Sequence, residues 1–449
     1  MTFELTKEFI EDLRTRIQSD DDTGVQTLVG DLHFADLAEV MDQLNLEEAT
    51  VVFKLVDSDK TSDALMELDE DLREDILAAL SPAEIATELE ELDTDDAADI
   101  LNELDTEIQG QVINQIQDEQ HAEDIVDLLR YQEGTAGAIM AKELVQVNEK
   151  WNVDGCVTEM RAQAENVTRV HSIYVVDDRN KLMGRLSLKD LITAPIKAQI
   201  RDIYIPKVDY VQVNTEIDDV AKIMRKYDLE ALPVVDEAHR LLGRITIDDI
   251  VDYITDEAER DYQLAAGISQ DVEADDTILE LTRARLPWLV LGLFGGLGAV
   301  YIMQGYEGAL ERFPELFFFT PLVAAMAGNV GVQSSAIIVQ GLANDTVTGS
   351  LLNRLIKEVG LALINGIALS LLVVLFGYLA NLDTLVSITI ALAMLSVIIM
   401  AALVGTFVPI LLDKRGIDPA IATGPFITTS NDIFGILLFF IIAKNILGF

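Results

Sequence analysis

The feature that most constrains this chain is a series of five long apolar stretches in its last third. They occupy residues 286–306, 316–344, 359–382, 384–412 and 419–443, and the fifth contains one charged residue, Asp432. A helix needs about 20 residues to cross the hydrocarbon core of a bilayer. The sequence therefore predicts five transmembrane helices with membrane lipid around them.

The residues before this region have the opposite character. The chain carries 77 Asp and Glu against 32 Lys and Arg, a net charge of −45, although 50% of its residues are hydrophobic. A single soluble globule does not combine these properties, so an acidic soluble part precedes the membrane part. Affinity for nucleic acid comes largely from basic residues that neutralise phosphates. The composition therefore argues against nucleic acid as a partner and favours cations.

Basic residues near the ends of the apolar stretches predict the orientation. They precede the first stretch and occupy the second-to-third and fourth-to-fifth connections: Arg283, Arg285, Arg354, Lys357, Lys414 and Arg415. The other two connections are dominated by acids. By the positive-inside rule, we expect a multi-pass protein of the inner or cytoplasmic membrane with its N-terminus in the cytoplasm and its C-terminus outside.

Short amphipathic helices are predicted from residue 25 to about residue 117. Apolar residues recur three or four apart at 36–44, 83–92 and 96–104, which is the spacing of one helix face. Ser81-Pro82 and Asp93-Thr94 place N-cap residues before two of these helices. We predict an acidic helical N domain over residues 1–135, built as a superhelix of small helices.

An internal duplication follows the helices. Residues 172–190 align with residues 231–249 without a gap, and each copy reads as strand, turn, strand and helix. A further helix is predicted before each copy, at 153–163 and 217–227. This arrangement resembles a tandem pair of CBS domains, which we place at residues 136–198 and 199–256.

The remaining residues complete the predicted architecture. A charged helical connector spans residues 257–283, and the transmembrane domain spans residues 284–449. The predicted fold class is multidomain: an all-α superhelical N domain, α/β tandem CBS domains, a long connecting helix and a five-helix α transmembrane domain.

Asp432 is the most informative residue of the membrane half. A carboxylate near the middle of an apolar helix costs about 2.5–3.5 kcal/mol on insertion scales, so such residues usually face a water-filled path or an ion. The structural alternative is a carboxylate capped by Thr428, Thr429 or Ser430. We interpret Asp432 as an ion-path residue.

Two small and polar segments are candidates for broken helices at membrane depth. Residues 327–335 contain Gly328, Asn329 and Gln333, and residues 423–425 read Thr-Gly-Pro. Unwound backbone inside a membrane is tolerated where it lines a cavity. The alternative for the first segment is helix packing through small residues.

Oxygen ligands alone would surround an ion in this region. The apolar stretches contain neither His nor Cys that would recruit zinc or copper. One carboxylate with carbonyl and amide oxygens suits an ion that keeps several of its waters, as Mg²⁺ does. This ranks Mg²⁺ first among Mg²⁺, Mn²⁺, Co²⁺ and Ca²⁺.

Taken in order, the whole chain resembles the MgtE family of magnesium channels. The matching motifs are residues 131–140 (YQEGTAGAIM), Gly328-Asn329-Xaa-Gly331 and the segment from Asp418 to Asp432. The resemblance implies a homodimer with a pore between subunits, in which Asp432, Gly328 and Asn329 form the pore site. One departure is Val332, where many relatives have a second amide.

The resemblance also implies that cytoplasmic Mg²⁺ bridges carboxylates of the N domain, the second CBS copy and the connector, and thereby closes the pore. Arg260 interrupts the acidic run of the connector, so one bridge is expected to be missing or replaced by a direct ion pair. The positions that match the regulatory Mg²⁺ ligands are Asp95, Asp99, Glu216, Asp218, Asp228, Asp249, Asp252, Glu257, Asp261 and Asp418.

CBS domains of many proteins bind adenine nucleotides through a Ser/Thr-x-x-Asp turn. Ser187 and Asp190 fit this pattern in the first copy, and Thr246 and Asp249 fit it in the second. The same pattern is an ordinary helix N-cap. ATP is accordingly a candidate modulator at Ser187 and Asp190.

Three classes of function remain. No nucleophile–base grouping or phosphate-binding loop is recognisable, so we expect no enzyme. The first choice is a Mg²⁺-selective uptake channel gated by cytoplasmic Mg²⁺, with Co²⁺ and Mn²⁺ as further permeant ions. The alternatives are an ion-coupled secondary transporter of divalent cations and a sensor that its helices merely anchor.

Overall fold

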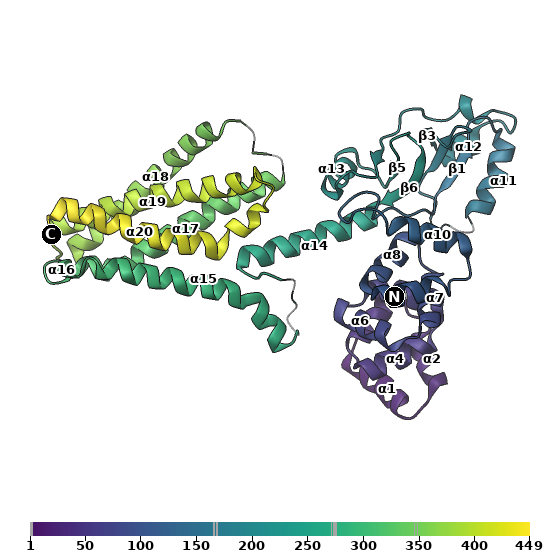
Figure 1. Cartoon of the computed structure of the whole chain (residues 1–449), viewed down its shortest axis with the longest axis horizontal. Coiled ribbons are helices and arrows are strands. Elements are labelled where there is room, and N and C mark those ends of the chain that lie inside the picture. The colour runs from purple at the N-terminus through teal and green to yellow at the C-terminus, as the bar shows by residue number, and fades with distance from the viewer. Residues whose placement is uncertain are drawn as a thin grey trace. The chain divides into compact units, whose positions relative to one another are not determined.

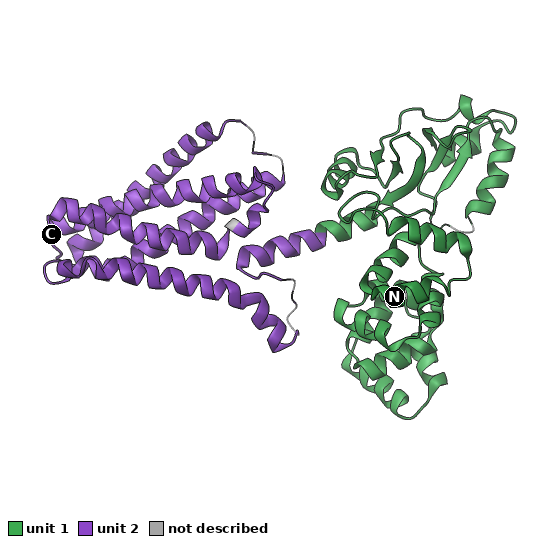
Figure 2. Cartoon of the chain, viewed as in Figure 1, with its two compact units in different colours: residues 1–254 green, residues 255–449 purple. Residues whose placement is uncertain are grey.

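The structure is a computed structural model that describes residues 3–164, 167, 169–270, 272, 276–344, 346–347 and 349–449. It divides into two compact units, Met1–Ile254 and Thr255–Phe449 (Figure 2). The first unit holds the short helices and both small sheets, and the second holds the long apolar helices (Figure 1). This confirms the predicted fold class.

Ten short helices open the first unit. Two of them begin as the sequence predicts: α7 starts after Ser81, whose side chain accepts from the Glu84 amide in a capping box, and α8 starts after Asp93. Asp93 makes no cap hydrogen bond, however, because its carboxylate pairs with Arg244 instead. The helices are α1 (Lys7–Gln18), α2 (Asp22–Val29), α3 (Phe34–Asp42), α4 (Leu46–Leu55), α5 (Ser58–Glu67), α6 (Glu70–Ala79), α7 (Pro82–Leu89), α8 (Thr94–Glu103), α9 (Thr106–Ile113) and α10 (Glu119–Leu128).

These helices share one hydrophobic core with the second CBS copy. Leu37, Leu65 and Leu101 of the helical region are fully buried, and Met224 and Leu232 of the second copy belong to the same core cluster. Each such side chain contributes about 1.5–3 kcal/mol on burial. The first CBS copy has a separate core around Val175, so the helical region is anchored on the second copy.

Both CBS copies form a three-stranded sheet with the same topology. The first strand pairs parallel with the second, and the second pairs antiparallel with the third. Both antiparallel pairs shift register at equivalent points, Val175/Val176 and Val234/Val235. The two copies therefore share this strand irregularity as well as their topology. The strands are β1 (Val145–Asn148), β2 (Ile173–Val176), β3 (Leu182–Leu186), β4 (Val211–Gln212), β5 (Ala231–Val235) and β6 (Leu241–Thr246).

The helices of the two copies confirm the repeat. α11 (Val153–Gln163) and α13 (Ile217–Tyr227) have the predicted bounds, and α12 (Leu188–Thr193) follows β3 as α14 follows β6. The copies meet through reciprocal backbone bonds, since Leu182 donates to the His239 carbonyl at 3.1 Å and Leu241 donates to the Asn180 carbonyl at 2.9 Å. They therefore pack as a pseudo-symmetric pair.

The connector is helical only in part. α14 (Ile247–Ala266) starts directly after β6 and is 20 residues long. The predicted connector of residues 257–283 is therefore not one helix, because α14 ends at Ala266 and α15 begins only at Ile278; residues 271 and 273–275 lie outside the described residues. A Thr277–Glu280 capping box explains this start, since the two side chains satisfy exposed amides at the helix N-terminus.

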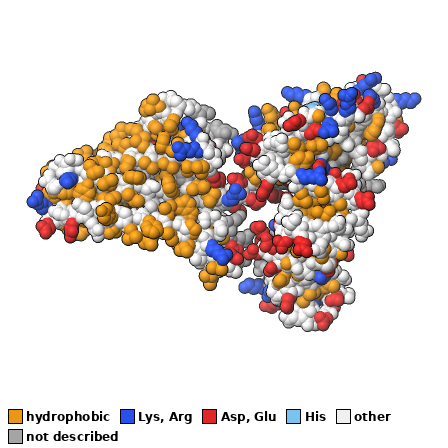
Figure 3. Space-filling model, viewed as in Figure 1, with side chains coloured by type: hydrophobic (Ala, Val, Ile, Leu, Met, Phe, Trp, Pro, Cys, Tyr) orange, Lys and Arg blue, Asp and Glu red, His pale blue; other side chains and the backbone are white. Residues whose placement is uncertain are grey.

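Five helices of the second unit are long and apolar enough to cross a membrane, as predicted. Hydrophobic side chains cover most of the visible face of this unit (Figure 3). α19 is its central helix, because 56% of its most apolar window is buried, against 11% for α15 and α18. The spans are α15 (Ile278–Gln304), α17 (Pro314–Ala343), α18 (Leu351–Leu379), α19 (Thr384–Asp413) and α20 (Gly424–Leu447); α16 (Glu307–Leu310) and the 3₁₀ turn η3 (Pro419–Ala422) are short.

Candidate metal sites

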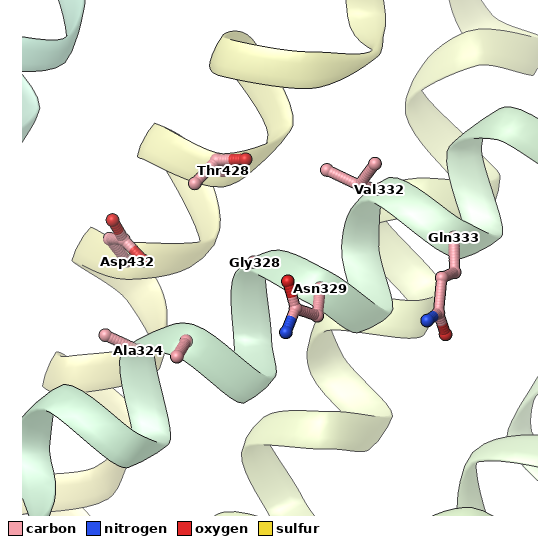
Figure 4. Close-up of a pocket in the computed structure, with 8 residues that line it drawn as sticks. Ala324, Gly328, Asn329, Val332, Gln333, Thr428 and Asp432 are labelled. Carbon is pink, nitrogen blue, oxygen red and sulfur yellow. The ribbon is translucent and has the colours of Figure 1, made fainter.

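A cavity of about 450 Å³ lies between α17 and α20 in the membrane unit (Figure 4). We call it the membrane cavity. Six waters of an ion's first hydration shell occupy about 180 Å³ at about 30 Å³ each, so the cavity has room for a hydrated cation. Its lining residues are Ala324, Ala325, Gly328, Asn329, Val332, Gln333, Thr428 and Asp432.

Helix periodicity determines which groups reach the membrane cavity. Residues four apart share a helix face, so Asn329 and Gln333 of α17 lie one turn apart, as do Thr428 and Asp432 of α20. No hydrogen bond or ion pair joins the Asp432 carboxylate to any residue that the structure describes. Its oxygens are thus available to a bound cation or its waters. All three predicted pore residues, Asp432, Gly328 and Asn329, border this cavity.

The prediction of a broken second span is wrong. α17 is a continuous helix from Pro314 to Ala343, so its carbonyls at Gly328 and Asn329 belong to the helix. The glycines instead permit close packing: a Cβ on Gly331 would lie 1.9 Å from Asn431 Nδ2, and a Cβ on Gly405 would lie 2.4 Å from the Gly331 carbonyl oxygen. Packing through small residues, the alternative interpretation, explains this segment.

The interruption predicted before Asp432 is present. The chain forms the η3 turn at Pro419–Ala422, and α20 begins at Gly424 with Pro425 in its first turn. Gly424 has φ +46°, and a Cβ there would lie 2.0 Å from the Ala265 carbonyl oxygen at the end of α14. Asp432 therefore lies about two turns inside α20. Thr428 does not cap it, because its hydroxyl donates to the Gly424 carbonyl.

A second carboxylate of the membrane unit was not predicted. Glu358 of α18 accepts a hydrogen bond of 2.6 Å from the buried Ser334 hydroxyl of α17. In the sequence, Glu358 directly precedes an apolar stretch and follows Lys357, so it reads as the charged end of a span. Its contact with α17 depends on tertiary packing that the pattern does not reveal.

An acidic cluster gathers at the start of α8 in the first unit. We call Asp93, Asp95 and Glu143 the carboxylate triad, because one oxygen from each lies within 4.8 Å of the other two. Asp96 and Asp249 interact electrostatically with these groups. Among the predicted sensor residues, the structure brings Asp95, Asp99 and Asp249 together here.

Burial and mutual repulsion raise the pKa of four carboxyl groups at the start of α8, those of Asp93, Asp95, Asp96 and Asp99. Burial, reinforced by Glu143, raises the pKa of Asp93 to about 6. Burial, reinforced by Asp249, raises that of Asp96 to about 8. Burial, reinforced by Asp96, raises the pKa of Asp95 well above its ordinary range, and burial with Glu103 raises that of Asp99 to about 6. Raised carboxyl pKa values of this kind indicate that the surrounding residues supply too little positive charge to balance the carboxylates.

Hydrogen bonds fix the positions of these side chains. Glu143 Oε2 accepts from the Thr94 amide at 3.2 Å and from the Thr94 hydroxyl at 2.8 Å. Arg244, buried at the end of β6, donates from Nη2 to Asp93 Oδ2 at 3.3 Å and from Nη1 to the Arg169 carbonyl at 3.0 Å. Asp249 Oδ2 accepts from the Thr246 amide and hydroxyl at 2.9 and 2.6 Å. The loop after α10 and the second CBS copy are thereby held against α8.

The other predicted sensor residues of the first unit lie outside this cluster. These side chains are exposed at the N-cap of α13, on α13, at its C-cap and on α14: Glu216, Asp218, Asp228 and Asp252, respectively. The Tyr253 hydroxyl donates to Asp218 Oδ1 at 3.4 Å, and Asp228 ends α13 in a left-handed conformation with φ 54°.

The remaining three predicted sensor residues, Glu257, Asp261 and Asp418, belong to the second unit. Glu257 forms an ion pair with Arg260 at 3.7 Å, which is one of the two outcomes expected for Arg260. Asp261 is half-buried on α14, and Asp418 is exposed with its carboxylate capping η3 through the Ala420 amide.

Sequence reasoning missed Asp93, Asp96 and Glu143 as members of the cluster. The first two lie in the segment that was interpreted only as a helix start. Three aspartates within four residues could have indicated a cation site there. Glu143 reaches α8 from 49 residues away through Thr94, and such a long-range contact leaves no local pattern.

The two candidate nucleotide turns differ. In the second copy, the Asp249 carboxylate accepts hydrogen bonds from the Thr246 amide and hydroxyl. These bonds stabilise the start of α14, which is the structural alternative to nucleotide binding. In the first copy, Ser187 is the N-cap of α12 but makes no side-chain cap hydrogen bond, and both Ser187 and Asp190 are half-buried. The first turn is therefore the one open to a ligand.

Family models match three parts of the chain. The model "Divalent cation transporter" matches residues 320–442, "MgtE intracellular N domain" matches residues 32–134, and "CBS domain" matches residues 136–197 and 200–256. The magnesium transporter MgtE of Thermus thermophilus is 34% identical over 97% of this chain and 98% of its own length. That of Enterococcus faecalis is 38% identical over 72% of each chain.

Two solved structures match the soluble part. The soluble part of a magnesium transporter is 31% identical, with a TM-score of 0.51 over 56% of this chain and 99% of that chain. The cytosolic domain of the Mg²⁺ channel MgtE in complex with ATP is 33% identical, with a TM-score of 0.52 over 54% of this chain and 99% of that chain. Together with the five apolar helices, these matches identify a multi-pass membrane protein with a cytosolic N-terminal region, and the chain belongs to the MgtE family of magnesium transporters.

Proposed function

We propose that this protein is a Mg²⁺-selective channel for magnesium uptake that closes when cytoplasmic Mg²⁺ binds its acidic soluble region. The observation that carries the proposal is the Asp432 carboxylate, which borders the membrane cavity between α17 and α20 without a partner among the described residues. In this proposal two subunits form the pore, Asp432 of each subunit faces the ion, and the C-terminus lies outside. The basic residues that flank the spans support this orientation.

The membrane cavity suits an ion that keeps its waters. Mg²⁺ dehydrates reluctantly and usually retains several waters when it binds protein. Asp432 would attract the hydrated ion, while the side-chain oxygens of Asn329 and Gln333 would accept hydrogen bonds from its waters. At an effective dielectric near 20, a divalent ion about 6 Å from one carboxylate gains about 5 kcal/mol, which favours entry and still permits exit.

The acidic cluster supplies the gate in this proposal. Without ions, the carboxylates of α8 repel Glu143 and Asp249, as the raised pKa values of Asp95 and Asp96 indicate. A bound divalent ion converts this repulsion into a bridge and stabilises the docked arrangement. We propose that the other regulatory positions, Glu216, Asp218, Asp228, Asp252, Glu257, Asp261 and Asp418, bind further Mg²⁺ ions in the closed state.

ATP is the modulator that we propose for the first CBS copy. The cytosolic domain of a related Mg²⁺ channel, 33% identical to this chain, has been crystallised in complex with ATP. Here Ser187 and Asp190 form the turn whose side chains are not used for capping. We propose that this turn holds the ribose of the nucleotide.

Flux into proteoliposomes that contain a Mg²⁺-sensitive dye tests the proposed function. Asp432→Ala should abolish uptake or reduce it at least about tenfold, because one carboxylate–cation contact is worth several kcal/mol at this dielectric. Asp383→Ser, which keeps a capping side chain at the start of α19, is the matched control and should transport normally. Uptake driven by voltage alone supports the channel, and a strict requirement for a Na⁺ or proton gradient supports the secondary transporter.

A further inference from the structure

We propose that Asn431 is a positioning residue that fixes the rotation of α20 against α17, holds Asp432 in place in the membrane cavity and thereby sets the discrimination between Mg²⁺ and the larger ion Ca²⁺. Asn431 is not among the residues that line the cavity, so it acts through its neighbour. The inference rests on the proposed function, because it takes Asp432 as the residue that faces the permeating ion.

Helix geometry couples Asn431 to Asp432. Successive residues of an α-helix point about 100° apart. Asp432 lines the membrane cavity together with Thr428, one turn earlier on α20 (Figure 4). Asn431 therefore points about a quarter turn away from the cavity, and its side chain is fully buried at 0% exposure. Any rotation of α20 that moves Asn431 moves Asp432 through the same angle.

A hydrogen bond and a close contact hold the Asn431 side chain on α17. Its Nδ2 donates to the Ala327 carbonyl oxygen at 3.3 Å. The same nitrogen lies over Gly331, where a Cβ would come within 1.9 Å of it. Ala327 and Gly331 flank Gly328, which lines the membrane cavity. The amide of Asn431 thus grips the turn of α17 that also forms one wall of the cavity.

The neighbouring contacts of α20 are less directional. Thr429 presents its Cγ2 methyl group to Gly295 of α15, and Thr428 presents its own to Gly328 of α17. Contacts between methyl groups and glycines depend on distance and hardly on angle, whereas a hydrogen bond weakens steeply when it is misaligned. The bond from Asn431 to Ala327 is therefore the contact that defines the rotation of α20 at this level.

Stability does not explain an asparagine at this position. Asn431 Oδ1 is buried, and no described residue donates a hydrogen bond to it. The penalty for an unsatisfied buried polar atom exceeds the average gain from one hydrogen bond between membrane helices. A leucine has a similar branched shape and would avoid that penalty. The amide therefore lowers the stability of the folded protein, and the position it imposes on α20 accounts for it.

Discrimination between Mg²⁺ and Ca²⁺ needs such a fixed position. The two ions carry the same charge, so attraction to the Asp432 carboxylate alone does not separate them. Selectivity between them depends on cavity size, ligand number and rigidity, because Mg²⁺ demands a regular shell whereas Ca²⁺ accepts a flexible one. If α20 rotates freely, the distance from Asp432 to the Asn329 side chain across the cavity varies, and the cavity accommodates both ions.

Uptake of Mg²⁺ and of Ca²⁺ by proteoliposomes containing the full-length protein, each followed with its own dye, tests the inference. Asn431→Leu should lower the ratio of Mg²⁺ to Ca²⁺ uptake about tenfold, since a misplacement of 1 Å caused by a distant mutation can cost about 100-fold. Its melting temperature in detergent should equal or exceed that of the parent. Asn445→Leu is the matched control, because Asn445 is exposed on α20 and its Nδ2 donates to the Ile441 carbonyl of the same helix. It should change neither quantity.

Asn431→Ser provides a second variant should the leucine variant not fold. Small residues are well tolerated where membrane helices meet, and serine is too short to reach the Ala327 carbonyl, so the same fall in the uptake ratio is expected. The inference is overturned if either folded variant keeps the parent ratio. It is also overturned if both variants lose uptake and melting temperature together, which is the signature of a purely structural role.

Asp432→Ala in the same assay separates this inference from the proposed function. Normal Mg²⁺ uptake by that variant would overturn the proposed function, and this inference with it. Blocked uptake by Asp432→Ala together with an unchanged ratio in folded Asn431→Leu would overturn this inference alone.

Discussion

Individual side chains set the chemistry of the membrane cavity. Polar groups come from Asn329, Gln333, Thr428 and Asp432, while Val332 presents two methyl groups to the same space. One wall of this cavity is therefore unable to accept a hydrogen bond from the waters of an ion.

Replacing Val332 with Asn should strengthen the interaction with a hydrated ion. One additional hydrogen bond is worth about 0.5–1.5 kcal/mol, so the Mg²⁺ concentration for half-maximal uptake should fall about 2- to 10-fold in the proteoliposome assay. Val332→Leu is the matched apolar control and should leave that concentration unchanged. Equal values for the Asn and Leu variants would remove Val332 from the determinants of ion affinity.

Glu88 of α7 gives the N-terminal helices a defined pH dependence. It accepts a hydrogen bond of 2.7 Å from the Thr61 hydroxyl of α5, and burial raises its pKa from about 4.5 to about 7. Between these values the folded protein binds more protons than the unfolded chain, so stability falls as pH rises from about 4.5 to 7 and then levels off. Glu88→Gln should remove this decline and stabilise the helices above pH 7 by up to about 3 kcal/mol.

Chemical denaturation of the full-length protein at several pH values, followed by circular dichroism, measures this effect. Glu84→Gln is an informative control, because the capping hydrogen bonds from Ser81 lower the pKa of Glu84 to about 2. Its contribution is lost as pH falls, the opposite direction to that of Glu88. A parent protein whose stability does not change between pH 4.5 and 7 would contradict the account of Glu88.

At the scale of elements, the sequence predicted most of the fold because periodicity reports local structure. The bounds of α11 and α13 follow directly from the pattern, as do the paired strands of the CBS copies. The glycines of α17 led to the wrong prediction of a broken helix, since Gly328 and Gly331 are compatible with both an unwound segment and a close helix contact. Only the neighbours, Thr428, Asn431 and Gly405, decide between the two.

The close contact between α17 and α19 should be sensitive to a single methyl group. A Cβ on Gly405 would meet the Gly331 backbone at 2.4 Å, so Gly405→Ala should destabilise the membrane unit by about 1–3 kcal/mol or more. Gly360→Ala on α18 has nothing within 4 Å and should be neutral or slightly stabilising. Thermal unfolding in detergent compares them, and equal melting temperatures would show that this contact is loose.

At the scale of the whole molecule, α14 continues from the first unit into the membrane unit. The helical region and the second CBS copy share one hydrophobic core, yet the carboxylates of α8 repel Glu143 and Asp249 at the same junction. Apolar contact therefore favours this packing, whereas repulsion between the carboxylates opposes it, and in the proposed mechanism bound cations shift the balance. The sequence indicated acidic surfaces, but the joining of Asp93, Glu143 and Arg244 required the folded chain.

Single-channel recording from membrane patches, with Mg²⁺ varied on the side of the soluble region, tests the central claim most directly. The account predicts voltage-driven unitary currents carried by Mg²⁺ whose open probability falls as Mg²⁺ on that side rises. The combined Asp95→Asn and Asp249→Asn variant should stay open at Mg²⁺ concentrations that close the parent, because its carboxylates no longer require a bridging ion. The absence of unitary currents from active protein, or an open probability that is independent of Mg²⁺ in the parent, would contradict the account.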